Sequence, residues 1–137
     1  MNRRLLAGRA PSTALRLAGG AVLAFAAVAA AAAEVPFTQA AFDKAVAAGQ
    51  PVVVDVQASW CPVCKAQKPI VESLLQEPKM KKVTLFSADF DTEQALKKQL
   101  RVVQQSTFVV FKNGKEVGRS TGETSKSTIA ALFDKAL

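Results

Sequence analysis

Residues 52–65 have the sequence VVVDVQASWCPVCK, in which a Cys-x-x-Cys pair closely follows a run of β-branched residues. An apolar run without alternation is typical of a strand that is covered on both faces of its sheet. The segment 61–76 then has apolar residues at helical spacing and ends before Glu77 and Pro78. We therefore predict that the two cysteines lie where a buried strand passes into a helix.

Strand-like and helix-like segments alternate along the rest of residues 34–137. Asn113 and Gly114 separate two of the strands, and this pair is typical of a hairpin with a type I′ turn. Thr38 and Thr92 are placed to cap two of the helices. The pattern predicts strands over 52–56, 83–90, 107–111 and 115–121, and helices over 38–49, 61–76, 92–100 and 129–137. This order predicts an α/β fold with a mixed sheet flanked by helices.

The position of the cysteine pair indicates redox chemistry. Cys61 is predicted at the N-terminus of a helix, where free N–H groups and the helix dipole stabilise a thiolate. Cys64 lies one turn further on, where it would be shielded and placed to close a disulfide or to release a mixed disulfide. Pro62 suits the first helical turn, but its missing N–H removes one donor that could have faced the Cys61 sulfur.

Three other interpretations of the pair stay open: a structural disulfide, a metal site and two unpaired buried thiols. A Cys-x-x-Cys loop is too short to constrain the unfolded chain much, so a structural bridge would gain little. Zinc needs four ligands, and the chain has no histidine and no third cysteine. A metal would therefore have to be shared between two chains.

Two residues near the pair stand out. Asp55 is the one charged residue in the valine run, and burial there should raise the pKa of its carboxyl, which suits a general acid or base near neutral pH. The alternative role is a hydrogen-bonded polar group of the core. Trp60 either gates the site or packs beside its loop.

The N-terminal segment 1–33 has the three parts of a secretory signal peptide. Four arginines precede the apolar run 21–33, which ends in the small residues Ala31 and Ala33 just before Glu34. This pattern predicts cleavage and export of a domain spanning 34–137, to the periplasm if the source is bacterial. An uncleaved membrane anchor is the alternative, because about 20 apolar residues span a bilayer.

The basic character of the chain belongs mainly to this leader. Without residues 1–33 the formal net charge falls from +7 to +3, because the leader holds four arginines and no acidic residue. The other dense group of cations, Lys79, Lys81 and Lys82, is predicted to form a solvated loop. This distribution does not support binding to nucleic acid.

The chain resembles the thioredoxin family over nearly all of residues 35–137. The resemblance rests on residues 52–65, on Pro69 inside the helix, on the hairpin 111–114 and on Gly122. It implies a thioredoxin fold with a central mixed sheet of four to five strands. It also implies that Cys61 is the nucleophile, that Cys64 is the resolving cysteine, and that Asp55 moves a proton to or from Cys64.

The sequence departs from the family pattern at two positions. Ser106 stands where the family has a cis-proline that shapes the substrate groove and discourages metal binding. A cis bond before serine costs about 3–4 kcal/mol, so we expect a trans bond there. Ser87 stands where many thioredoxins have a lysine near the buried aspartate, so Asp55 should be more easily protonated.

The resemblance implies an enzyme, a protein-disulfide oxidoreductase that needs no cofactor or metal. Trp60, Pro62, Lys65, Ser106 and Gly122 are expected to shape its site. The leading hypothesis is a monomeric reductase of disulfides in exported proteins, supplied with electrons by a membrane thiol reductase. The alternatives are a disulfide-forming oxidant, or a non-enzymatic module that binds a partner or forms a dimer around a metal or iron–sulfur cluster.

Overall fold

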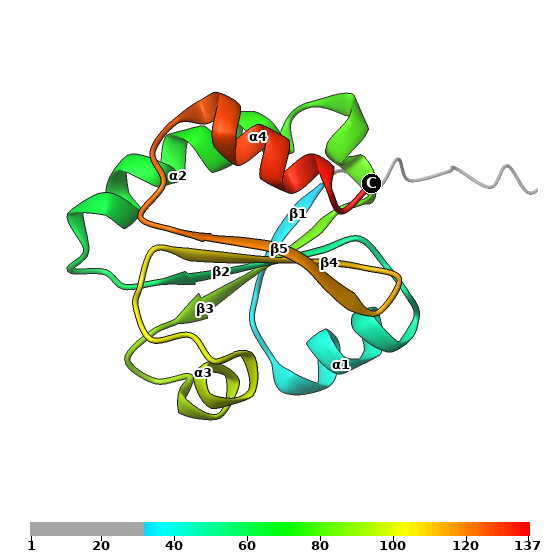
Figure 1. Ribbon diagram of the computed structural model, residues 1–137, viewed down its shortest axis with the longest axis horizontal. Helices are drawn as coiled ribbons and strands as arrows, with labels where there is room; N and C mark the ends of the chain where they lie inside the picture. The colour runs from blue at the N-terminus through cyan, green and yellow to red at the C-terminus, as the bar shows by residue number, and fades with distance from the viewer. Residues whose placement is uncertain (1–31) are drawn as a thin grey trace, which may run out of the picture.

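A five-stranded mixed sheet forms the centre of residues 32–137, the part of the chain that this computed structural model describes (Figure 1). Its strands are β1 (Ala33–Pro36), β2 (Val52–Gln57), β3 (Thr84–Asp89), β4 (Thr107–Lys112) and β5 (Lys115–Thr121). The order across the sheet is β1-β3-β2-β4-β5, with β1, β2 and β3 parallel and the last two strands antiparallel to their neighbours. The predicted α/β fold with a mixed sheet of four to five strands is confirmed.

Helices cover both faces of the sheet. They are α1 (Gln39–Ala47), α2 (Pro62–Leu75), α3 (Gln94–Leu100) and α4 (Lys126–Asp134), with a short 3₁₀ helix, η1 (Pro78–Lys82), after α2. Figure 1 shows α2 and α4 on one face and α1 and α3 on the other. Each parallel crossover between β1, β2 and β3 thus places its helix against the sheet.

The central strand β2 separates two apolar clusters. Val52, Val54 and Val56 pack in the cluster under α1 and α3, and Val53 packs in the cluster under α2 and α4. Because side chains alternate along a strand, Asp55 shares the face of Val53. The valine run therefore directs one carboxylate toward the layer that contains the cysteine helix.

Aromatic side chains complete both clusters. On the α1 side, Phe42 lies edge-on to Phe86 and Phe111, with ring centroids 6.0 and 5.4 Å apart. On the α2 and α4 side, Phe108 meets Phe133 at 5.2 Å and 87°. Edge-to-face pairs of this kind stabilise a core beyond the burial of their area.

Several predicted boundaries are confirmed and two are wrong. The Thr38 hydroxyl caps α1 by accepting from the Ala41 N–H at 3.2 Å. Thr92 does not cap α3, because the helix begins after Glu93 and the Thr92 N–H is bound by the Asp89 carboxylate at 3.2 Å. The last helix ends at Asp134, so Leu137 lies exposed instead of on the predicted apolar face.

The predicted leader, residues 1–33, lies outside the described residues apart from its last two positions. Ala33 already belongs to β1. Within residues 32–137, no helix has the length and hydropathy needed to cross a bilayer.

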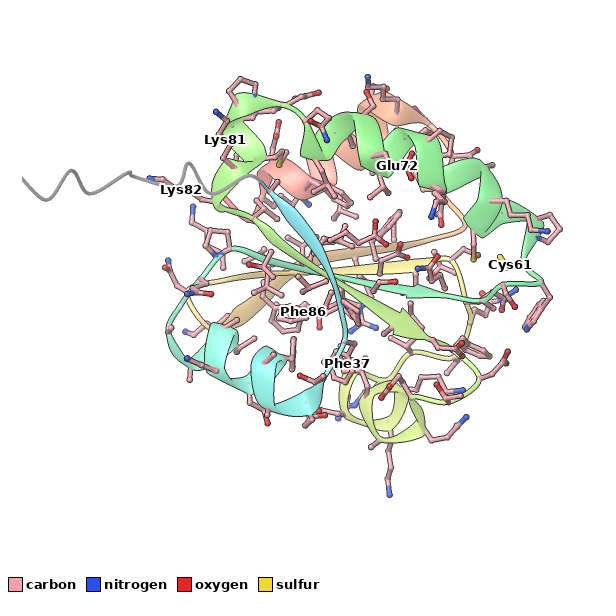
Figure 2. The ribbon with its side chains drawn as sticks, turned by 180° about the vertical axis from the view of Figure 1, so that it is seen from behind. Phe37, Cys61, Glu72, Lys81, Lys82 and Phe86 are labelled. Atoms are coloured by element: carbon pink, nitrogen blue, oxygen red, sulfur yellow. The ribbon has the colours of Figure 1, made fainter. Side chains whose placement is uncertain are left out.

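The lysine cluster at the end of α2 lies in η1, not in a loop as the sequence predicted. Lys79 lies 2.7 Å from the Asp134 carboxylate, which links η1 to α4. Figure 2 shows Lys81 and Lys82 at the end of the molecule opposite to Cys61. These cations are therefore far from the cysteine pair.

Candidate active site

The cysteine pair begins helix α2. Cys61 is the N-cap residue, with extended backbone angles, and its Sγ accepts a hydrogen bond from the Cys64 N–H at 3.1 Å. A sulfur here takes the place of the side-chain oxygen that usually satisfies a free N–H at a helix start. The prediction that Cys61 lies at the helix N-terminus is confirmed, and Figure 2 shows it at one end of the molecule.

Both cysteines are free thiols, and both are buried. Cys61 is 1% exposed and Cys64 is 5% exposed, with Ala58 in contact and Val63 and Phe90 packed against them. The sequence predicted shielding for Cys64, whereas the fold encloses Cys61 as well. Each cysteine residue therefore leaves little surface accessible to solvent in this conformation.

Ser106 brings a hydroxyl to the Cys61 sulfur. Its Oγ lies 3.4 Å from the Cys61 Sγ, and the residue is buried in the loop that connects α3 to β4. The bond before it is trans, as predicted, because no cis peptide occurs among the described residues. Its φ of 59° lies in the left-handed region, which costs an L-residue about 1–2 kcal/mol. Surrounding contacts must offset that strain.

The two thiols differ in acidity. Burial alone would raise the pKa of the Cys61 thiol, but hydrogen bonds from the Cys64 thiol, the Ser106 hydroxyl and the N–H groups of Cys64 and Val63 lower it overall. Burial and the hydrogen bond to Cys61 raise the pKa of Cys64. Cys61 is therefore the thiol that ionises first.

Asp55 is buried on β2, and its Oδ1 has no hydrogen-bond partner in the described part of the chain. Burial, followed by the charge of Glu34, raises the pKa of this carboxyl to about 7, while Lys68 acts in the opposite direction. The predicted increase is confirmed. The influence of Lys68, which lies on helix α2, was not predicted from the sequence.

Ser87 lies beside Asp55 in the register of β2 and β3, where it accepts a hydrogen bond from the Gln57 amide. It also lines two surface hollows. One, of about 300 Å³, is formed with Gln57, Ser59 and Asp89, and the other, of about 330 Å³, with Glu34, Val35 and Pro36. Solvent therefore reaches the strand position next to the buried carboxyl.

The remaining predicted residues surround the pair in different ways. Trp60 is 55% exposed, and its indole N–H donates to the Asp91 carboxylate at 2.7 Å. Pro62 and Lys65 lie exposed on the first turn of α2. Gly122 has a φ of 74°, and its N–H donates to the Ser106 carbonyl at 2.9 Å. All of them thus lie in an element that carries the site or bond to one, and the Lys65 N–H donates to the Cys61 carbonyl at 3.2 Å.

One residue of the site was missed from the sequence. Gln67 lies on the buried face of α2 together with Cys64 and Val71, and its amide donates to the carbonyls of Ser106 and Glu123. A polar residue at an apolar position of the helical repeat was the available signal. Within residues 32–137, no group of three or more potential ligands exists that could hold a metal.

The fold and the paired thiols at a helix start together define a thiol–disulfide oxidoreductase. The thioredoxin family model matches residues 33–135, and the chain belongs to the thioredoxin family. This match covers the whole sheet and all four helices.

Known thioredoxins are similar along most of their length. The thioredoxin of Chlamydia trachomatis is 35% identical over 98 residues, which span 72% of this chain and 93% of that protein. The crystal structure of Trxlp from Edwardsiella tarda is 46% identical with a TM-score of 0.70, covering 72% of this chain and 95% of that one. The thioredoxin structure from Malassezia sympodialis is 26% identical with a TM-score of 0.66, covering 74% and 92%.

Proposed function

We propose that the protein reduces disulfide bonds in exported proteins. The Cys61 thiolate attacks one sulfur of a substrate disulfide, forming a mixed disulfide and releasing the other substrate sulfur as a thiolate, which takes up a proton. Cys64 then loses its proton and attacks the Cys61 sulfur. The second substrate thiol leaves, and two electrons have passed from the protein to the substrate.

The observation that supports reduction over oxidation is the nature of the donors around Cys61. The groups that lower the pKa of this thiol are neutral: two side-chain donors and two backbone N–H groups. A strong oxidant owes its potential to a reduced form that is strongly stabilised. Neutral donors stabilise a thiolate less than a facing cation does, which favours a reducing potential.

Asp55 is proposed as the proton acceptor for the second step. Burial raises the pKa of the Cys64 thiol, so this thiol needs a base before it can attack. Asp55 has a pKa of about 7 and belongs to the face of β2 that packs against the helix carrying Cys64. Its acidity thus suits proton transfer at neutral pH.

The leader supports export, and export determines the electron donor. A thioredoxin reductase in the cytosol cannot reach a domain released on the other side of the membrane. We therefore propose a membrane thiol reductase as donor, a periplasmic location and action as a monomer. Recovery of a periplasmic protein that begins at Glu34 supports this part, and a full-length chain in the membrane fraction contradicts it.

The reduction potential tests the function directly. Trp60 is the single tryptophan and adjoins Cys61, so its fluorescence in glutathione or dithiothreitol buffers reports the redox state, once the metal content has been measured. A value near or below about −250 mV supports a reductase, and one near −120 mV indicates an oxidant. The absence of a reversible two-electron transition would leave the metal-binding or partner-binding alternatives.

A further inference from the structure

Gln67 is a buried amide next to the cysteine pair. It is 2% exposed and lies one helical turn after Cys64 on α2. Its Nε2 donates to the Glu123 carbonyl at 2.8 Å and to the Ser106 carbonyl at 3.4 Å. One side chain thus connects the cysteine helix to the loop before β4 and to the loop after β5.

The energetic balance at Gln67 indicates a role beyond filling space. Its Oε1 is buried without a hydrogen-bond partner in the described part of the chain. An unpaired buried acceptor is unfavourable, and a methionine or leucine of similar volume would avoid it. The orientation of the amide is fixed by its surroundings, because both atoms that face Nε2 are carbonyl oxygens.

The Ser106 carbonyl receives a second donor from Gly122. The Gly122 N–H binds it at 2.9 Å, so two hydrogen bonds fix the peptide plane that follows Ser106. This residue has the strained φ of 59°. The same backbone conformation places its Oγ 3.4 Å from the Cys61 Sγ.

We propose that Gln67 is a positioning residue for thiol exchange, which holds the Ser106 loop so that the Ser106 hydroxyl faces the Cys61 sulfur and stabilises its thiolate. The proposal rests on the attacking role given to Cys61 above, but it is independent of the direction of electron flow. No hydrogen bond joins Gln67 to the Cys61 sulfur in the described part of the chain, so we expect its effect to pass through Ser106.

A double-mutant cycle tests this dependence. The rate at which iodoacetamide modifies Cys61 in the reduced protein is measured across pH 5–10 for the wild type, Gln67→Met, Ser106→Ala and the double variant. We expect each single change to raise the pH at which Cys61 becomes reactive and to slow modification at pH 7 by about threefold. The double variant should be no slower than Ser106→Ala alone.

Two results would overturn the proposal. Either Gln67→Met leaves the rate and pH profile of Cys61 modification unchanged, or Gln67→Met slows modification equally in the presence and in the absence of the Ser106 hydroxyl. Gln76→Met, at the exposed C-cap of the same helix, is the matched control and should leave the profile unchanged. Urea unfolding of each variant reports folding. If Gln67→Met does not fold, Gln67→Leu also removes the donor without adding a charge, and the same outcomes apply.

This experiment separates the proposal from the function. Iodoacetamide replaces the substrate, so no substrate disulfide or electron donor is needed. An oxidising reduction potential would contradict the proposed reductase function without changing the result of the double-mutant cycle. A wild-type Cys61 that titrates like an ordinary thiol would instead contradict the attacking role itself.

Discussion

The two faces of β2 differ in what they contribute. One face carries Val52, Val54 and Val56 into an apolar cluster lined by phenylalanine rings. The other carries Asp55, whose carboxyl is buried and has an unpaired oxygen in the described part of the chain. One face of β2 is therefore wholly apolar, whereas the other combines the buried Val53 with a buried carboxyl that lowers stability when it ionises and is proposed to serve the chemistry.

The largest expected effect is on stability at high pH. The folded-state pKa of Asp55 is about 7, above its ordinary value of 3.8. The stability that comes with a protonated Asp55 carboxyl is therefore fully present below pH 4 and is lost as the pH rises through 7. We expect Asp55→Asn to stabilise the protein by about 4 kcal/mol at pH 8 and by almost nothing at pH 4. Urea unfolding of the reduced protein at both pH values measures this. An equal change in stability at pH 4 and pH 8 would mean that the fold does not raise the pKa of this carboxyl.

The same substitution should impair one chemical step selectively. Asp55→Asn removes the base for Cys64, and general acid–base catalysis contributes at least about 100-fold. We expect resolution of the mixed disulfide to slow by about that factor, while first attack by Cys61 changes little. Rapid-mixing measurements of Trp60 fluorescence separate the two steps. Equal slowing of both would contradict the proposed role.

A substitution on the apolar face of β2 should lower stability at every pH and leave the exchange chemistry nearly unchanged. Val54→Ala leaves a cavity beneath α1, and we expect a loss of stability of about 2 kcal/mol that does not vary between pH 5 and 8. Both steps of exchange should stay within twofold of the wild type. A tenfold loss of activity in a folded Val54→Ala protein would show that the two faces are not independent.

Ser106 gives a smaller test beside the cysteine pair. Ser106→Ala and Ser106→Gly both remove the hydroxyl, but glycine adopts the left-handed conformation without strain and should be more stable than alanine by about 1 kcal/mol. Both variants should share a reduction potential that is more negative by about 15–30 mV, since the thiolate loses a donor. Different potentials for the two would show that strain, and not the hydroxyl, influences the thiolate.

The elements that the sequence predicted are those encoded by local patterns. The valine run became β2, and Asn113 and Gly114 have φ values of 51° and 77°, as a type I′ turn requires. β1 was missed because it has four residues, includes Pro36 and lies at the edge of the sheet, where the apolar signal is weak.

The site was predictable only in part. Cys61, Cys64 and Asp55 stand out by residue type, and the burial that raises the pKa of Asp55 follows from its strand. The approach of Lys68, the left-handed Ser106 and the contacts of Gln67 depend on segments that are distant in sequence. No local pattern encodes such contacts. The leader and the role in export stay predictions.

The enclosure of Cys61 has a consequence for the lifetime of the protein. The Cys61 residue is 1% exposed, so small oxidants should reach its sulfur mainly during brief openings of its surroundings. A protein substrate, by contrast, can spend binding energy to displace those surroundings. Damage by peroxide should therefore follow the frequency of spontaneous opening, whereas productive exchange follows the affinity of the partner, and the two can be tuned separately.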